Sequence, residues 1–144
     1  MEYTLENIRN NVMTKITDYN LLNLDISELD EYIAALLIPS IAMCEFDITY
    51  DEISKELIAD NEISPLEFEA ICLYIVYQWV SNKVSTITNF EPRLGSTDYK
   101  TFSNANNLNA LVAAKKDAYT MASYYANKCN NKRVMAKMVK KWVI

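Results

Sequence analysis

Carboxylates are the side chains of this chain best suited to chemistry, because it contains no histidine and only one glycine. The pattern Asp47-x-Thr49-x-Asp51 is like the first half of a calcium-binding loop, in which oxygen ligands recur at every second residue. It lacks the glycine that such a loop has at its sixth position, and Ile58 stands where the bidentate glutamate would be. We therefore predict no metal site in this segment or elsewhere.

Other acidic side chains could act as a general acid and a general base, but nothing in their spacing selects two of them. A solvated acidic face is the simpler interpretation. The absence of histidine excludes Ser-His-Asp and Cys-His catalysis, and one glycine cannot build a phosphate-binding loop. We expect no catalytic residue, no enzyme activity and no cofactor. The carboxylates considered are Glu28, Asp30, Glu31, Asp51, Glu52 and Glu56.

The three cysteines, Cys44, Cys72 and Cys129, are too far apart in the sequence for a CxxC redox or metal motif. Two of them fall on apolar helical stripes. We predict reduced thiols that fill the core as small hydrophobic side chains.

The charges are divided unevenly along the chain. The formal net charge is −5 and the isoelectric point is near 4.8, unlike a general nucleic-acid-binding domain. Residues 25–69 contain thirteen acids and one base, Lys55, whereas after Asp117 there are six bases and no acid. This division suggests that the basic end binds a partner, although a solvated end is the simpler alternative.

The elements that position these residues are predicted to be helices. Apolar residues recur at helical spacing, and glycine is almost absent. We expect an all-α fold: a small bundle of four to five helices with a long central helix, a long loop and a C-terminal docking tail. Pro39 should kink or end the second helix. The sequence contains no run of about 18 apolar residues, which is the length that a membrane-spanning helix needs. Helices are predicted over 3–17, from Asp25 or Ser27 onward, over 50–58, over 65–84 and over 103–129.

The strongest local signal is a capping box at the start of the central helix. Ser64 can cap the helix, Pro65 suits its first position, and Glu67 can reach back to the capping residue. The helix that follows is apolar on most sides, which is typical of a helix surrounded by others. We expect a long loop over 86–101 and a cap at Ser103 for the last long helix.

Residues 130–144 form a basic, amphipathic tail that we separate from a helical domain over 1–129. As a helix, the tail has an apolar face and a basic face, although residues 139–144 could equally be a short strand. It could bind a membrane surface, dock in a groove of a partner protein, or fold back on its own core. We favour docking, because tryptophan and methionine are enriched at protein interfaces. The expected partner-binding residues are Lys132, Arg133, Val134, Met135, Met138, Val139, Trp142, Val143 and Ile144.

Two segments are distinctive: residues 68–80 read FEAICLYIVYQWV, and residues 98–108 read DYKTFSNANNL. Their order is a Tyr-Gln-Trp helix, a loop, an Asp-aromatic-x-x-aromatic-Ser-Asn segment and a last long helix. In these features the chain resembles the head–tail connector, or neck adaptor, proteins of tailed bacteriophages. The resemblance covers about residues 25–128 and rests on structural rather than catalytic motifs. The first helix and the basic tail match nothing in it.

The resemblance implies a helical protein, not an enzyme, that forms a homo-oligomeric ring, usually twelvefold, beneath the portal protein in the neck of the virion. Such a ring extends the DNA channel, presents a platform for a stopper or tail-completion protein, and is made in the cytoplasm of the host bacterium. In relatives the C-terminal segment commonly reaches the portal, which assigns the tail to portal binding. An acidic wall from residues 25–69 would let the genome pass without specific binding.

The resemblance also implies roles for residues outside the tail. Residues in or beside the long loop would contact a neighbouring subunit or the tail of the phage: Phe90, Arg93, Tyr99 and Phe102. Those on the central helix would lie in the core or in an interface: Phe68, Tyr77 and Trp79.

The main alternative is a small helical phage regulator that binds a single host protein. A regulator needs no closed oligomer, so ring symmetry distinguishes the two functions.

Overall fold

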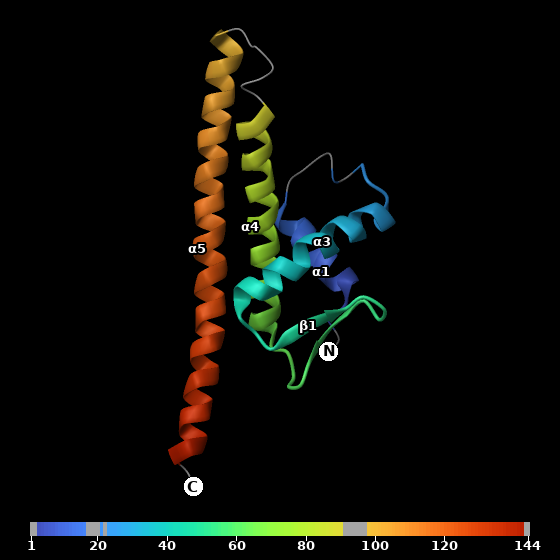
Figure 1. Ribbon diagram of the computed structural model, residues 1–144, viewed down its shortest axis with the longest axis vertical. Coiled ribbons are helices and arrows are strands. Elements are labelled where there is room, and N and C mark those ends of the chain that lie inside the picture. Colours follow the sequence, from blue (N-terminus) through green and yellow to red (C-terminus); the bar gives the residue numbers. More distant parts are fainter. Residues whose placement is uncertain (1–2, 17–20, 22, 91–97, 143–144) are drawn as a thin grey trace.

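Helices account for most of the described residues, which are 3–16, 21, 23–90 and 98–142 of a computed structural model (Figure 1). The all-α prediction is confirmed, and a small two-stranded sheet is added to it. The elements in chain order are α1 (Leu5–Lys15), α3 (Ile26–Cys44), β1 (Ile48–Asp51), β2 (Glu56–Ala59), α4 (Pro65–Phe90) and α5 (Asp98–Trp142).

Helix α4 is the central helix, as predicted. It packs against α1, α3 and α5, and six consecutive residues from Ala70 to Ile75 are buried. Helix α5 runs antiparallel to α4 along its other side (Figure 1). Small buried residues on α5, namely Ala122, Ala126 and Cys129, let the two backbones approach closely. Because α5 is much the longer helix, it extends past the beginning of α4.

Both long helices are longer than predicted. Helix α4 continues to Phe90 instead of ending near 84, and α5 begins at Asp98, so Ser103 lies inside the helix and does not cap it. The predicted loop over 86–101 therefore has helix at both of its ends. The reason is local: the only proline and glycine of this region, Pro92 and Gly95, lie between the two helices, so nothing interrupts either helix nearer its centre.

The predicted contacts of this region concern residues at the helix ends and between them. Phe90 is the last residue of α4, and Tyr99 and Phe102 belong to the beginning of α5. Their side chains, and the whole of Arg93, lie outside the described residues.

The predicted helix over 50–58 is wrong, because this segment is a β-hairpin. Strands β1 and β2 are antiparallel, with Ile48 opposite Ala59 and Tyr50 opposite Leu57. The Asp51 carboxylate accepts hydrogen bonds from the Ile53 amide at 3.0 Å and the Ser54 hydroxyl at 3.0 Å, which forms the turn. Asp51 is therefore a turn residue.

Tertiary contacts explain why this short amphipathic segment forms strands. Besides pairing with β1, strand β2 pairs with the chain before α1, where the Leu57 amide donates to the Tyr3 carbonyl at 2.9 Å. An isolated bridge joins Thr4 to Glu56. Tyr3 and Thr4 are consequently extended, and α1 starts at Leu5 with the Thr4 hydroxyl accepting from the Asn7 amide.

Helix α3 begins where predicted but does not end at Pro39. Asp25 is its cap, accepting from the Glu28 amide at 2.8 Å. The helix continues through Pro39 to Cys44 because Leu36, Leu37, Ser40, Ile41 and Cys44 are buried on both sides of the proline. Burial of several apolar side chains, at roughly 1.5–3 kcal/mol each, outweighs the roughly 3 kcal/mol cost of an interior proline.

We expect the buried core to dominate stability. Ile33 of α3 is fully buried in it, so Ile33→Ala should lower the free energy of unfolding by about 3 kcal/mol. The same substitution at Ile53, which is 95% exposed, should change it by less than about 0.5 kcal/mol. Urea denaturation followed by circular dichroism measures both; equal effects would contradict the described core.

Candidate functional site

The end of α5 leaves the body of the molecule as a free helical segment. Arg133 is the last described residue of α5 that is not exposed; the described side chains after it are all exposed. Nine residues, Val134 to Trp142, extend the helix by about 13 Å beyond that point. We call residues 130–142 the α5 end. No break in α5 marks the predicted boundary between 129 and 130, and the α5 end is a helix, not a strand.

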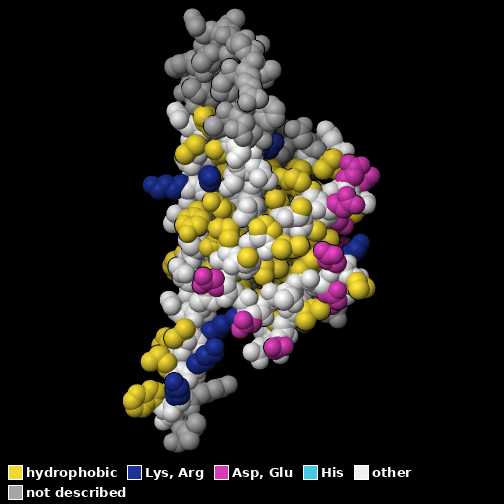
Figure 2. All heavy atoms as spheres, in the orientation of Figure 1, with side chains coloured by type: hydrophobic (Ala, Val, Ile, Leu, Met, Phe, Trp, Pro, Cys, Tyr) yellow, Lys and Arg dark blue, Asp and Glu magenta, His cyan; other side chains and the backbone are white. Residues whose placement is uncertain are grey.

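The apolar residues of the α5 end share one side of the helix. Val134, Met135, Met138, Val139 and Trp142 recur at spacings of three and four residues, and Trp142 is 84% exposed. Figure 2 shows them on the outer side of the projecting segment, with lysine and arginine side chains toward the body. This apolar face does not contact the chain's own core, so the fold-back alternative is wrong for the described residues. Val143 and Ile144 lie outside those residues.

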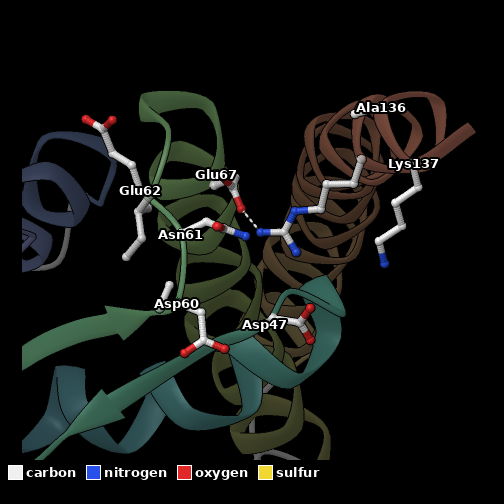
Figure 3. A pocket seen from close by; sticks show the side chains of 10 residues that line it. Asp47, Asp60, Asn61, Glu62, Glu67, Ala136 and Lys137 are labelled. Carbon is white, nitrogen blue, oxygen red and sulfur yellow. Dashed lines mark hydrogen bonds and ion pairs between the residues drawn. The ribbon is translucent and has the colours of Figure 1, made fainter. Parts of the chain in front are cut away.

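One ion pair fixes this orientation. The Arg133 guanidinium pairs with Oε2 of Glu67, whose residue is only 7% exposed (dashed line in Figure 3). The other carboxylate oxygen of Glu67 accepts from the Ser64 amide at 3.2 Å, and the Ser64 hydroxyl accepts from the Glu67 amide at 3.2 Å. The predicted capping box is therefore present, and the same carboxylate that completes it also holds α5. We call these three residues the Glu67 junction.

Two further contacts support the junction from α3 and the chain after it. The Arg133 guanidinium lies 5.1 Å from the ring centre of Phe46, in a cation–π contact. The amide of Asn130 donates to the carbonyl of Cys44 at 3.0 Å, so α5 caps the end of α3. Arg133, predicted to bind a partner, thus binds the chain's own body and turns the apolar face of the α5 end away from it.

A hollow of about 230 Å³ lies beside the junction. Its lining includes Asp47, Asp60, Glu62 and Lys137 (Figure 3). Its volume is below the roughly 300–1,000 Å³ of typical small-molecule sites. We therefore regard it as the space under the departing helix and not as a ligand pocket.

Three of the carboxylates considered for chemistry, Asp30, Glu31 and Glu52, line one groove between α3 and the β-hairpin, whereas the cysteines stay in the core. Within the described residues, no group of three or more histidine, cysteine or acidic side chains could hold a metal ion. The three cysteines are free and buried, as predicted. Burial raises the pKa of the Cys44 and Cys72 thiols to about 12, and it also raises that of Cys129. These thiols are protonated at neutral pH and are poor nucleophiles.

The three aromatic residues singled out on α4 are half-buried and pack against the core. The Phe68 ring stacks on Tyr3, with ring centres 4.7 Å apart. The ring centres of Tyr77 and Tyr119 are 5.4 Å apart, and the Lys115 ammonium lies 5.9 Å from the Tyr77 ring centre. Trp79 also packs against the core. They help to hold α4 against its neighbours.

Sequence reasoning found the apolar face of the α5 end but missed the Glu67 junction. Glu67 and Arg133 are 66 residues apart, and nothing in the local pattern of either residue selects the other. The only usable signal was the capping box, which placed Glu67 at the start of α4.

Comparisons with protein families, with curated proteins and with solved structures found no match for this chain. Among the described residues, none of the helices combines the length and the apolar character needed to span a membrane.

The junction makes a specific prediction about stability. Glu67→Ala should lower the free energy of unfolding by about 2 kcal/mol, because it removes half of the cap and leaves Arg133 without its partner. Ser64→Ala removes only the cap and should cost about 1 kcal/mol. Hydrogen exchange at residues 130–133 should accelerate in Glu67→Ala but not in Ser64→Ala. Equal exchange in the two variants would contradict the junction.

The thiols give a second prediction. At pH 8 the folded protein should not react with iodoacetamide at Cys44 or Cys72, because their raised pKa leaves almost no thiolate. In 8 M urea all three cysteines should react. Mass spectrometry counts the adducts; rapid labelling of Cys72 in the folded protein would contradict its burial.

Proposed function

We propose that this protein is a structural head–tail connector of a tailed bacteriophage, which forms a ring beneath the portal and joins the capsid to the tail. The observation that carries the proposal is the α5 end, a helix that projects from the body with an exposed apolar face. Exposed apolar faces of this kind mark surfaces that other proteins cover. The segments at 68–80 and 98–108 supply the resemblance that names the assembly.

The body of the protein suits a scaffold. Its described residues contain no group of three or more histidine, cysteine or acidic side chains that could hold a metal ion, and their buried thiols are poor nucleophiles. In this proposal the chain is not an enzyme and uses no cofactor. Its work is to hold the α5 end in a fixed direction, which the Glu67 junction does.

The proposed ring has other copies of the chain, the portal protein, and a stopper or tail-completion protein as its partners. The resemblance gives it twelve subunits, a place in the neck of the virion, and synthesis in the bacterial cytoplasm. Thirteen acids in residues 25–69 would make the channel wall repel phosphates, so genome DNA would pass without binding. The resemblance also gives the portal as the partner of the α5 end.

The proposal predicts a closed ring. Native mass spectrometry of the purified chain, alone and with the portal protein, should detect one large oligomer of defined copy number. A chain that stays monomeric even with the portal would contradict the proposal and favour the regulator that binds a single host protein.

Removing the projecting segment should uncouple folding from assembly. Deleting residues 134–144 keeps Arg133 and its ion pair, so helical content by circular dichroism should fall only in proportion to the residues removed. Binding to the portal in a pull-down should be lost. Unchanged binding by the deleted chain would show that the α5 end is not needed for binding the portal.

A further inference from the structure

A second surface of the molecule is apolar, like one face of the α5 end, and carries the opposite charge. It is an open groove of about 800 Å³ between the first half of α3 and the β-hairpin, which we call the α3 groove. Its apolar lining includes Ile26, Ala34, Ile38 and Tyr50. Ile26 and Ile38 are 66% and 54% exposed, which is unusual for isoleucine on a helix whose other face is packed in the core.

The charged lining of the α3 groove is mainly acidic. It has three carboxylates, Asp30, Glu31 and Glu52, and one ammonium, Lys55. Asp30 is already paired with Arg9 at 2.6 Å. Glu31 and Glu52 form no ion pair with another residue in the described part of the chain.

The carboxylates at the start of α3 also repel one another. Asp25 and Glu31 both raise the pKa of Glu28, with Asp25 the larger cause. A cation arriving near Glu31 would reduce this repulsion.

The α5 end has the opposite charge beside its apolar face. Lys132, Lys137 and Lys141 are exposed along it, and no acid follows Asp117. A chain cannot insert its own α5 end into its own α3 groove. The groove lies across α4 from α5, and the Arg133–Glu67 ion pair directs α5 away from the body (Figure 1).

We infer that the α5 end of one copy of this chain binds in the α3 groove of the next copy. Met135, Met138 and Trp142 would lie over the apolar floor at Ile26 and Ile38, and the flanking lysines would lie beside Glu31 and Glu52. This inference rests on the proposed ring, and it makes a second copy, not the portal, the direct partner of the α5 end. Loss of portal binding on deletion of residues 134–144 would then follow from loss of the ring.

The arrangement explains how a ring would be built. The α5 end and the α3 groove are different surfaces on opposite sides of the molecule, so the contact between two copies is heterologous. Repeating a heterologous contact from one copy to the next builds a ring when the rotation between copies closes. Direct pairing of two α5 ends is disfavoured, because it would place lysines beside lysines. Charge complementarity, in contrast, favours the groove over a second α5 end.

Charge reversal tests the inference in the full-length chain. The groove variant is Glu31→Lys with Glu52→Lys, and the α5 variant is Lys137→Glu with Lys141→Glu. Each alone should weaken ring formation about tenfold or more, measured by light scattering and native mass spectrometry with the portal present. A chain carrying all four substitutions should recover the ring, because the charges are again opposite. Reversals at the exposed residues Lys116 and Asp117 serve as controls and should leave the ring unchanged.

The outcomes separate this inference from the proposed function. If both reversed variants form the ring as well as the unmodified chain does, the groove is not the site and the connector function stands. If the α5 variant keeps the ring but loses the portal, the α5 end belongs to the portal and the inference is wrong. If the unmodified chain forms no ring under any condition, the connector proposal fails as well.

Discussion

One buried carboxylate joins the beginning of α4 to the far end of α5. Glu67 uses one oxygen to cap its own helix through Ser64 and the other to bind Arg133, so local and tertiary structure depend on the same side chain. A carboxylate this well buried is stable as a charge only when its oxygens are satisfied. Together with the buried Ala122, Ala126 and Cys129, the pair ties α5 to α4 at one register. It also fixes the point at which α5 leaves the body.

The consequence is a helix with a fixed rotation. With Arg133 turned toward Glu67, the residues on the opposite side of the same helix, among them Met135 and Trp142, point away from the core. An exposed apolar face carries a risk of aggregation, and a partner that covers it removes that risk. Six bases after Asp117 keep the segment charged until then. In the proposed function, the body holds one docking helix in a defined direction.

Local signals in the sequence were enough for the helical core. The Ser64–Glu67 capping box, the Asp25 cap and the apolar run of α4 act within one or two turns, and all were predicted correctly. The β-hairpin was not, because Tyr3 and Leu57, which pair, are 54 positions apart and tertiary contacts overrode a helical pattern. Helix α3 continues through Pro39 because residues on both sides of the proline are buried in the core. The Glu67–Arg133 pair and the α3 groove arise only when distant segments meet.

Hydrogen exchange in the α5 end, measured against protein concentration, tests the central claim most directly. In a dilute monomer, amides between Val134 and Trp142 have no tertiary cover and should exchange rapidly, whereas those near Ala122 and Ala126 should be protected. At concentrations where the chain assembles, the account predicts strong protection of the α5 end together with the first half of α3. Assembly that leaves exchange in the α5 end unchanged would contradict it.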